Sequence, residues 1–474
     1  MVPEYKIFIN GEWRTSPRKL QVKSPFNGEV VGEVYLASPD DLEDAVISAQ
    51  KALEETKKLP SYKRAEILEF ISNEIARRKE EFSQMITKEM GKPILFSRAE
   101  VERAIFTFKI ASEEAKRING EIIPLDLASH SEGRFGFVRR FPIGVILAIT
   151  PFNFPLNLVA HKVAPAIASG NPIILKPSSQ APIVSAMLAE IIEKSGYPTG
   201  GFNLVPCKSD EIELLVRDDR IKMVSFTGSS EVGWRLKSIA GKKKITLELG
   251  GNAAVVVEPD ANLDYAIKRI ALGSFGQAGQ SCIAVQRIYV NEKIYDEFEK
   301  QFVEETKKIK VGNPFEPDTI VGPMIDENAA MKTENWVNEA IQNGARILIG
   351  GKRNGTFYEP TILVDVKPDM KVSCQEVFAP VVTLEKYRYF EEAIEKVNNS
   401  RYGLQAGVFT SDYKKIFYAF EKIEVGGVII NDYSTYRIDH MPYGGVKDSG
   451  FGREGIRYAI QEMTEMKLLV LNFI

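Results

Sequence analysis

The sequence predicts an α/β protein in which two successive regions each form a mostly parallel sheet covered by helices. Short, wholly apolar runs such as GVILAIT at 144–150 are typical of strands that are buried on both faces of such a sheet. Helical stretches separate these runs, most clearly at 183–195. A second series of apolar runs begins near residue 249, so a second α/β region is expected there.

The N-terminal part is expected to begin with short strands and to continue with helices. Residues 40–58 are rich in Ala, Glu and Leu, and apolar residues recur on one helical face over 67–86. Gly91 and Pro93 follow, and a glycine with a proline after it is a common end of a helix. We therefore expect one helical segment that ends at Gly91, and a further helix over 98–119.

The remaining strands and helices follow from the same patterns. In the first region, strands are expected at 144–150, 172–177, 202–206 and 222–228. In the second region, helices are expected near 295–310 and 331–343, and strands at 253–258, 287–291, 346–351, 407–410 and 427–431. The alternating polar segment 121–140 predicts an exposed hairpin, and the apolar stretch 467–474 predicts an edge strand that needs a partner.

Length, charge and residue usage exclude several classes of protein. A chain of 474 residues is too long for one ordinary core, so two or three domains are expected. The net charge of -3, without a long run of one sign, argues against a nucleic-acid or membrane-surface protein. Three widely spaced cysteines and three scattered histidines indicate neither a disulfide framework nor a metal site. Without a signal peptide or a membrane-length apolar run, the cytoplasm is the expected compartment.

Two residues stand out as candidates for catalysis. Cys282 lies in FGQAGQSC, where Gly276 and Gly279 would let a substrate approach the backbone closely. Glu248 follows an apolar run and precedes two glycines, and a buried carboxylate of this kind has the raised pKa that suits a general base. Taken alone, such a cysteine is more often a small apolar core residue, and such a glutamate is more often a salt-bridge partner.

Two further segments lie where strands of the first region end, which is the edge at which parallel sheets bind ligands. Asn153 follows the strand at 144–150, and its amide could donate to a developing oxyanion, although turn asparagines are more common. In FTGSSEVG a helix is expected to begin at Ser229, where backbone N–H groups could hold a phosphate. The glycine spacing there is not GxGxxG, so the ordinary dinucleotide fingerprint is absent.

Eight motifs together resemble one family. The glutamate motif LELGG and the cysteine motif FxxxGQxC lie 34 residues apart, and the others are TPFNFPL, PAIASGN, KPSSQAP, FTGSSEVG, EVFAPV and PYGGVKDSGFGRE. In order and spacing they resemble the aldehyde dehydrogenase superfamily over nearly the whole chain. The resemblance implies the aldehyde dehydrogenase fold, with a Rossmann-like cofactor domain (1–119 and 140–248), an α/β catalytic domain (249–458) and a small β oligomerisation domain (120–139 and 459–474) that forms dimers or tetramers.

The resemblance also implies a reaction. Cys282 is the expected nucleophile, whose thiolate attacks the aldehyde carbon, while the Asn153 side chain and the Cys282 backbone N–H stabilise the oxyanion. Hydride transfer to a nicotinamide then leaves a thioester, and Glu248 activates the water that hydrolyses it. Lys162 matches a lysine assigned to a proton path. The alternatives are a catalytically inactive, crystallin-like relative and a relative that passes the acyl group to coenzyme A; the catalytic residues argue against the first and Glu248 against the second.

The cofactor is expected to be NADP, with NAD as the alternative. NAD-preferring relatives often carry a glutamate three residues after the cofactor lysine, whereas this chain has Ser179, which can bond a 2′-phosphate. Lys208 is expected to supply positive charge nearby. The other positions that the resemblance assigns to the cofactor are Ile149, Thr150, Pro151, Phe152, Lys176, Phe226, Gly228, Ser229, Val232, Leu249, Glu376 and Phe378.

The substrate is expected to be a small hydroxyaldehyde such as lactaldehyde or glyceraldehyde. Within the family, the chain most resembles archaeal-type lactaldehyde dehydrogenases and non-phosphorylating glyceraldehyde-3-phosphate dehydrogenases. Arg103 and Arg437 stand near two positions that grip the substrate phosphate in the latter, but Ser281 and Phe154 replace an arginine and a tyrosine there. A salt-bridge role for the two arginines is equally open, as are succinate semialdehyde and glyceraldehyde 3-phosphate as substrates.

Overall fold

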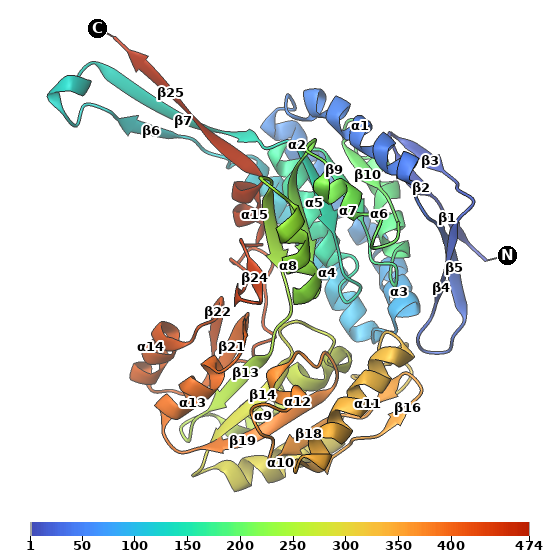
Figure 1. The fold of residues 1–474 in the computed structure, drawn as a ribbon, viewed down its shortest axis with the longest axis vertical. Coiled ribbons are helices and arrows are strands. Elements are labelled where there is room, and N and C mark those ends of the chain that lie inside the picture. Colours follow the sequence, from blue (N-terminus) through green and yellow to red (C-terminus); the bar gives the residue numbers. More distant parts are fainter. Residues whose placement is uncertain (1, 474) are drawn as a thin grey trace.

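The first of two large sheets has eight strands and is mainly parallel. The structure is a computed structural model that describes residues 2–473, and Figure 1 shows its two large sheets, one above the other. Strands run in the order β24-β12-β11-β8-β9-β10-β2-β3, and the five from β12 to β10 are parallel to their neighbours. Their bounds are β2 (Ile7–Ile9), β3 (Glu12–Arg14), β8 (Val145–Ile149), β9 (Ile173–Lys176), β10 (Phe202–Leu204), β11 (Ile221–Thr227), β12 (Lys244–Glu248) and β24 (Gly450–Phe451).

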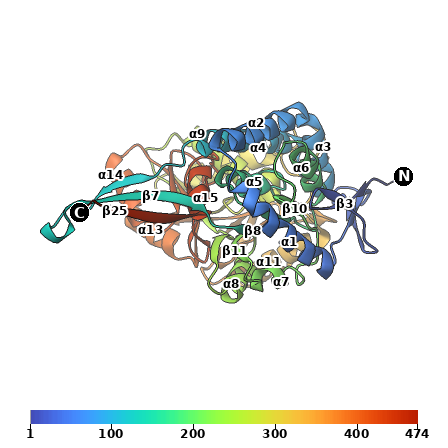
Figure 2. The same ribbon diagram turned by 90° about the horizontal axis from the view of Figure 1, so that it is seen from above.

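Helices cover both faces of this sheet, as the uniformly apolar strands predict. Along β8, Ile146 and Ala148 join the core formed with α2–α6, whereas Val145 and Leu147 join the core on the other face, with α1. Seen from above, α7 and α8 lie on the opposite side from α2–α4 (Figure 2). The helices are α1 (Pro39–Thr56), α2 (Ser61–Arg77), α3 (Lys79–Met90), α4 (Ile94–Ala115), α5 (Asn157–Ser169), α6 (Ile183–Glu193), α7 (Glu213–Arg217), α8 (Ser230–Ile239) and α15 (Ile456–Glu462).

The second large sheet has seven strands in the order β15-β18-β19-β14-β13-β21-β22, all parallel to their neighbours except β15. Its strands are β13 (Ala253–Val257), β14 (Val285–Asn291), β15 (Arg346–Ile349), β18 (Thr361–Val364), β19 (Val381–Tyr387), β21 (Gln405–Phe409) and β22 (Gly427–Ile430). The sequence predicted five of these strands and missed β18 and β19. The helices of this second region are α9 (Leu263–Phe275), α10 (Tyr295–Lys307), α11 (Glu327–Gln342), α12 (Lys371–Cys374), α13 (Phe390–Asn398) and α14 (Tyr413–Lys422), together with the short helix η2 (Gly276–Gly279).

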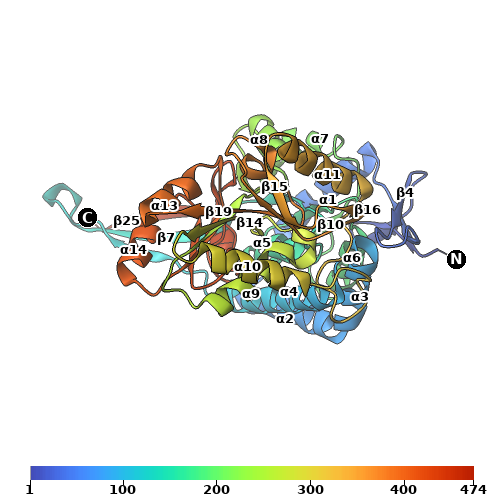
Figure 3. The same ribbon diagram turned by 90° about the horizontal axis from the view of Figure 1, so that it is seen from below.

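A three-stranded sheet projects from the body as an arm (Figures 1 and 3). It consists of β6 (Glu121–Pro124), β7 (Arg134–Pro142) and β25 (Thr464–Asn472), with the short helix η1 (Ser129–Ser131) in the hairpin. This confirms the predicted hairpin, while the terminal strand begins three residues earlier than predicted. The smaller sheets are formed by β1 (Glu4–Tyr5), β4 (Lys19–Lys23) and β5 (Val30–Tyr35), by β16 (Arg353–Asn354) and β17 (Phe357–Tyr358), and by β20 (Tyr402–Gly403) and β23 (Val446–Lys447).

The prediction of one helical segment up to Gly91 was wrong. Arg78 adopts a non-helical backbone (φ -99°, ψ 19°) that separates α2 from α3, and its guanidinium pairs with Glu81 and with Glu190 of α6. The helix expected at 98–119 is α4, which begins and ends four residues earlier. Within residues 2–473, no helix combines the length and the apolar character that crossing a membrane requires.

Glu89, near the end of α3, makes stability depend on pH. Its buried carboxylate accepts hydrogen bonds from the backbone N–H groups of Ile183 and Val184 at the start of α6. Burial raises the pKa of Glu89 to about 8, against 4.5 for an exposed glutamate. Between pH 4.5 and about pH 8, the folded protein therefore keeps a proton on Glu89 that the unfolded chain releases. The free energy of unfolding consequently falls as the pH rises through this range.

We expect Glu89→Gln to gain stability relative to the unmodified protein as the pH rises from about 5 to about 8, by up to about 1.4 kcal/mol per pH unit. The measurement is the midpoint of thermal unfolding at both pH values. Glu69→Gln, at an exposed position of α2, is the control and should show no such trend. A difference between Glu89→Gln and the unmodified protein that stays constant with pH would contradict the raised pKa.

Candidate functional site

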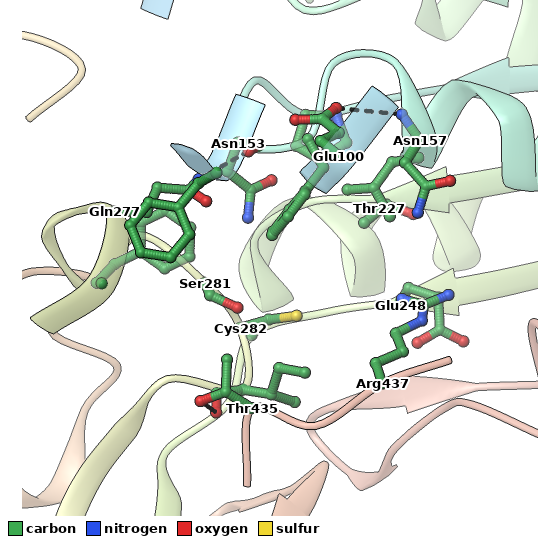
Figure 4. A pocket seen from close by; sticks show the side chains of 18 of the residues that line it. Glu100, Asn153, Asn157, Thr227, Glu248, Gln277, Ser281, Cys282, Thr435 and Arg437 are labelled. Carbon is green, nitrogen blue, oxygen red and sulfur yellow. Dashed lines mark hydrogen bonds between the residues drawn. The ribbon is translucent and has the colours of Figure 1, made fainter. Parts of the chain in front are cut away.

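A cavity of about 450 Å³ lies between the two large sheets (Figure 4). The first sheet contributes the residues that follow the carboxyl ends of β8, β11 and β12, which is the edge where parallel sheets bind ligands. The second sheet contributes the loop before β14, the segment before β19 and the segment after β22. Of the predicted residues, those that line the cavity are Arg103, Pro151, Phe152, Asn153, Phe154, Gly228, Ser229, Glu248, Leu249, Ser281, Cys282, Glu376, Phe378 and Arg437.

Cys282 is held at the cavity wall by a tightly constrained loop. Gln277 and Ala278 adopt left-handed backbone angles (φ 56° and 55°), and a Cβ at Gly279 would lie 2.2 Å from the carbonyl oxygen of Ala379. The Cys282 thiol is half-buried, and its Sγ lies 3.1 Å from the hydroxyl oxygen of Tyr443. Burial raises the pKa of the thiol to about 11, and the hydrogen bond with Tyr443 acts in the opposite direction. The thiol therefore needs a proton acceptor before it can act as a nucleophile.

Glu248, the last residue of β12, is suited to accept that proton. Its side chain is buried, and neither carboxylate oxygen has a hydrogen-bond partner among the residues that the structure describes. Burial raises the pKa of Glu248 well above its usual range, and the negative charge of Glu454 raises it further, against the effect of Arg437. A carboxyl group with a raised pKa that lines the same cavity as a thiol is the arrangement expected of a general base.

Asn153 lies in the turn that follows β8 and is almost fully buried. Its side-chain Nδ2 donates to the backbone carbonyl of Gln280 at 3.1 Å, and its own carbonyl accepts from Gln277 Nε2 at 2.8 Å. In Figure 4 its amide points toward the segment that carries Ser281 and Cys282. The amide is thus fixed by the loop of the nucleophile. Gln277 was not predicted as a site residue, although it stands in the cysteine motif.

Lys162 lies behind the cavity, in a buried chain of ion pairs. Its Nζ lies 3.0 Å from Glu454 Oε1 and 3.1 Å from the hydroxyl oxygen of Ser225. The other carboxylate oxygen of Glu454 accepts from Arg437 Nη2 at 3.1 Å. Burial raises the pKa of Glu454, but Lys162, His161 and Arg437 outweigh it and lower this pKa to about 2. Glu454 was not predicted, although it ends the quoted motif PYGGVKDSGFGRE.

The two candidate arginines both reach the cavity and both have carboxylate partners. Arg103 forms two hydrogen bonds with Asp439, at 2.7 and 3.2 Å, and Arg437 pairs with Glu454. The Arg437 guanidinium also lies 3.7 Å from the centre of the Tyr443 ring. Tyr443 therefore connects Arg437 to Cys282. Phe154 lies beside Arg103, with its ring centre 5.6 Å from that guanidinium.

A second part of the cavity, lined by Thr227, Gly228 and Ser229, offers polar groups that could hold the phosphates of a cofactor. Ser229 caps α8, and its side chain accepts from the backbone N–H of Val232. Because Ser229 lines the cavity, the N-terminus of α8 lies at the cavity wall, and a helix N-terminus favours an anion. Thr227 Oγ1 is buried without a partner among the described residues. A Cβ at Gly250 would lie 2.4 Å from the carboxylate of Glu376, so only a glycine allows the backbone to pass this close to that carboxylate. Burial raises the pKa of Glu376 to about 7.

The remaining predicted cofactor residues lie outside the cavity, along the same sheet edge. Lys176 ends β9 and Lys208 follows β10, which is parallel to β9, so both lie at the carboxyl edge. Lys176 is buried, which lowers its pKa, whereas Ser179 and Lys208 are exposed. The predicted residues that do not line the cavity are Ile149, Thr150, Lys162, Lys176, Ser179, Lys208, Phe226 and Val232.

We expect Tyr443→Phe to slow alkylation of Cys282. The Tyr443 hydroxyl lowers the pKa of the thiol, so its loss leaves less thiolate at a given pH, by roughly tenfold for each pKa unit. Labelling by iodoacetamide near pH 9 can be followed by mass spectrometry of the peptide that carries Cys282. Tyr436→Phe, in the same cavity wall, is the matched control. Equal rates in both variants would show that the Tyr443 hydroxyl does not act on the thiol.

Comparison with known proteins gives full-length matches. A family model described as the aldehyde dehydrogenase family matches residues 13–469. A 3-sulfolactaldehyde dehydrogenase of Priestia aryabhattai is 48% identical over 472 residues, covering 99% of this chain and 98% of that protein. A lactaldehyde dehydrogenase of Methanocaldococcus jannaschii is 43% identical over 471 residues, covering 98% and 100%.

Solved structures match equally well. Aldehyde dehydrogenase 21 from Physcomitrella patens, in complex with the reaction product succinate, superposes with a TM-score of 0.99 at 46% identity, covering 100% of this chain and 99% of that one. The glyceraldehyde-3-phosphate dehydrogenase GapN from Methanocaldococcus jannaschii, complexed with NADP, has a TM-score of 0.93 at 43% identity, covering 96% and 100%.

Proposed function

Because the chain belongs to the aldehyde dehydrogenase family, we propose that it oxidises a short hydroxyaldehyde, or a short aldehyde with an anionic tail, to the carboxylic acid with NADP. One observation carries the proposal. A single cavity holds a thiol, an unpaired buried carboxyl group and a fixed amide (Cys282, Glu248 and Asn153) together with two arginines. The thiol end is suited to acyl chemistry, and the arginines are suited to the substrate tail.

The first step joins the thiol to the aldehyde. Glu248 takes the proton of the Cys282 thiol, and the sulfur attacks the carbonyl carbon to form a thiohemiacetal. Negative charge then develops on the former carbonyl oxygen. The free N–H of the Asn153 amide and the backbone N–H of Cys282 donate to it, and loss of one such donor typically costs about a hundredfold or more in rate.

The second half of the reaction releases the acid. The nicotinamide, when bound, supplies the hydride acceptor that converts the thiohemiacetal to a thioester. Once Glu248 has passed on the proton of the thiol, it takes a proton from water, whose oxygen attacks the thioester carbon. The carbon–sulfur bond breaks, and the carboxylic acid and the Cys282 thiolate are released. Lys162 and Glu454 form a buried ion pair whose charges act on Glu248, and this pair is the proposed destination of that proton. The presence of Glu248 argues against transfer to coenzyme A, and the presence of Cys282, Glu248 and Asn153 together argues against an inactive relative.

The preference for NADP rests on Ser179 and Lys208. They follow the carboxyl ends of the adjacent parallel strands β9 and β10, so a serine hydroxyl and a lysine are available at one edge of the sheet. A carboxylate at position 179 would repel a 2′-phosphate. The GapN relative was solved with NADP, as was a glyceraldehyde-3-phosphate dehydrogenase from Bacillus halodurans at 33% identity.

The proposed substrate is a short aldehyde because Arg437 and Cys282 both contact the side chain of Tyr443. Tyr443 contacts the Cys282 sulfur with its hydroxyl and the Arg437 guanidinium with its ring face. A molecule whose aldehyde carbon meets the sulfur therefore reaches the arginine with a tail of few atoms. Lactaldehyde and glyceraldehyde are the first candidates. Succinate semialdehyde is the second, supported by the succinate in aldehyde dehydrogenase 21.

The arm of β6, β7 and β25 is the proposed oligomerisation domain, with boundaries at 120–139 and 459–474. β25 pairs with β7 along one edge, and its other edge meets no further strand among residues 2–473. Many of its apolar side chains are exposed, including Met466, Leu468 and Leu469. Such an edge favours pairing between copies, which agrees with a dimer or a tetramer.

The test of the reaction is the absorbance of reduced nicotinamide after NADP and a panel of small aldehydes are mixed with the enzyme. We expect a rise with lactaldehyde or glyceraldehyde in the absence of coenzyme A, and none with Cys282→Ala. Glu248→Gln should lower kcat by about a hundredfold or more, because general-base catalysis is worth that much. A flat trace with both NADP and NAD, or a rise only with coenzyme A, would overturn the proposal.

The cofactor preference is tested by the ratio of kcat/KM for NADP to that for NAD. Ser179→Glu should lower this ratio by about tenfold or more, since a carboxylate repels the 2′-phosphate. Lys208→Ala should lower it in the same direction by removing a positive charge. Lys222→Ala, an exposed lysine at the opposite edge of the sheet, should leave it unchanged. A ratio that stays constant in Ser179→Glu would refute this explanation.

A further inference from the structure

Behind the arginine end of the cavity lies a buried carboxylate that the reaction does not use. Asp439 is buried, and it accepts hydrogen bonds from the Arg103 guanidinium and from Asn157 Nδ2 at 3.0 Å. His161 Nε2 lies 2.8 Å from the same carboxylate. Burial raises the pKa of Asp439, but these partners outweigh it and hold the pKa far below its usual range. Asp439 is therefore a permanent negative charge beside Arg103.

The charges around this end leave a small positive excess. Within the linked ion pairs, Arg103, Arg437 and Lys162 are positive, and Asp439 and Glu454 are negative, so these pairs leave one positive charge. Lys92 and Glu100, the next buried ion pair, cancel each other. Burial lowers the pKa of His161, which favours the neutral ring. Glu248 belongs to the thiol end of the cavity and is not one of the ion pairs at this end.

We propose that Asp439 is a specificity-determining positioning residue: by holding Arg103, it leaves one net positive charge for the substrate tail and selects a monoanion over a phosphate dianion. The inference rests on the proposed function, because it concerns the tail of the same aldehyde. The tails that fit are a carboxylate or a sulfonate. A phosphate monoester carries close to two negative charges above neutral pH and would leave one of them buried without compensation.

Arg437 is the group that remains for the tail. Its Nε is buried without a hydrogen-bond partner among residues 2–473, although the side chain lines the cavity. His161 Nε2 lies within reach of both Asp439 and Arg437 Nη2, at 2.8 and 3.2 Å. A guanidinium only donates and a carboxylate only accepts, so this nitrogen can serve one of the two. When it donates to Asp439, Arg437 keeps its N–H groups for the ligand.

Two further observations agree with a single charge. Ser281 lies in the cavity wall next to the nucleophile and adds no cation there. The relative with 48% identity is named for 3-sulfolactaldehyde, an aldehyde that carries a sulfonate. The relative with 46% identity was solved with the reaction product succinate, and the corresponding aldehyde carries a carboxylate. Both tails are monoanions.

The experiment compares kcat/KM of the full-length enzyme with NADP for succinate semialdehyde and for glyceraldehyde 3-phosphate, at a pH where the phosphate is a dianion. We expect the unmodified enzyme to prefer succinate semialdehyde. Asp439→Asn should shift the ratio toward the phosphate by about tenfold or more, mainly through KM, because Arg103 then adds its charge to the site. Asp439→Glu keeps the carboxylate and should keep the original preference.

Asp218→Asn is the matched control, since it removes a carboxylate from another arginine pair, far from the cavity, and should leave the ratio unchanged. If Asp439→Asn does not fold, Ser281→Arg adds the charge instead and should shift the ratio in the same direction. An unchanged ratio in the folded variant overturns the inference. Lactaldehyde separates the two proposals. If the enzyme oxidises lactaldehyde but does not prefer succinate semialdehyde over glyceraldehyde 3-phosphate, only the role of Asp439 is refuted. If the enzyme oxidises no aldehyde, the proposed function is refuted.

Discussion

A chain of buried ion pairs fixes the relation between the two sheets at the active site. Lys162 of α5 holds Glu454, and Glu454 holds Arg437, which belongs to the segment after β22. Breaking a buried pair by removing one partner typically costs about 3–5 kcal/mol, because the other charge remains buried. The C-terminal segment that closes the cavity is thus tied to the first sheet by charge as well as by the packing of α15. Since apolar residues would often be at least as stable there, the charges are best explained by their effect on the neighbouring catalytic groups.

Backbone strain supplies the second constraint. The left-handed angles at Gln277 and Ala278, and at Phe378 on the facing segment, each cost of order 1–3 kcal/mol, and such residues persist where the surrounding structure holds them. A Cβ at Gly251 would lie 2.1 Å from the carbonyl oxygen of Cys282. The two glycines after Glu248 therefore allow the strand that carries the base to pass directly against the loop that carries the nucleophile. This contact gives a physical reason for glycines in the motif LELGG.

The sequence predicted what depends on local pattern and missed what depends on distant contacts. Uniformly apolar strands such as β8 were predicted because both of their faces are buried, whereas β19 was missed because its last residues, EKY, interrupt the apolar run. Cys282, Glu248 and Asn153 were predicted from motifs, and they do line one cavity. Tyr443 and Asp439 were not predicted. Tyr443 is 161 residues away from Cys282, and Asp439 is 278 residues away from His161, so only the folded chain brings each pair together.

Arg437 couples the two ends of the cavity. Burial raises the pKa of both Cys282 and Glu248, and the positive charge of Arg437 lowers both. An arginine that faces the substrate tail therefore also sets how readily the thiol and the base ionise. A substrate tail that neutralised Arg437 completely would raise the pKa of both Cys282 and Glu248. This would oppose formation of the thiolate and would make Glu248 a stronger base. The charge of the tail and the acid–base chemistry at the sulfur consequently cannot be adjusted independently, and the number of carboxylates around the arginines bears on both specificity and rate.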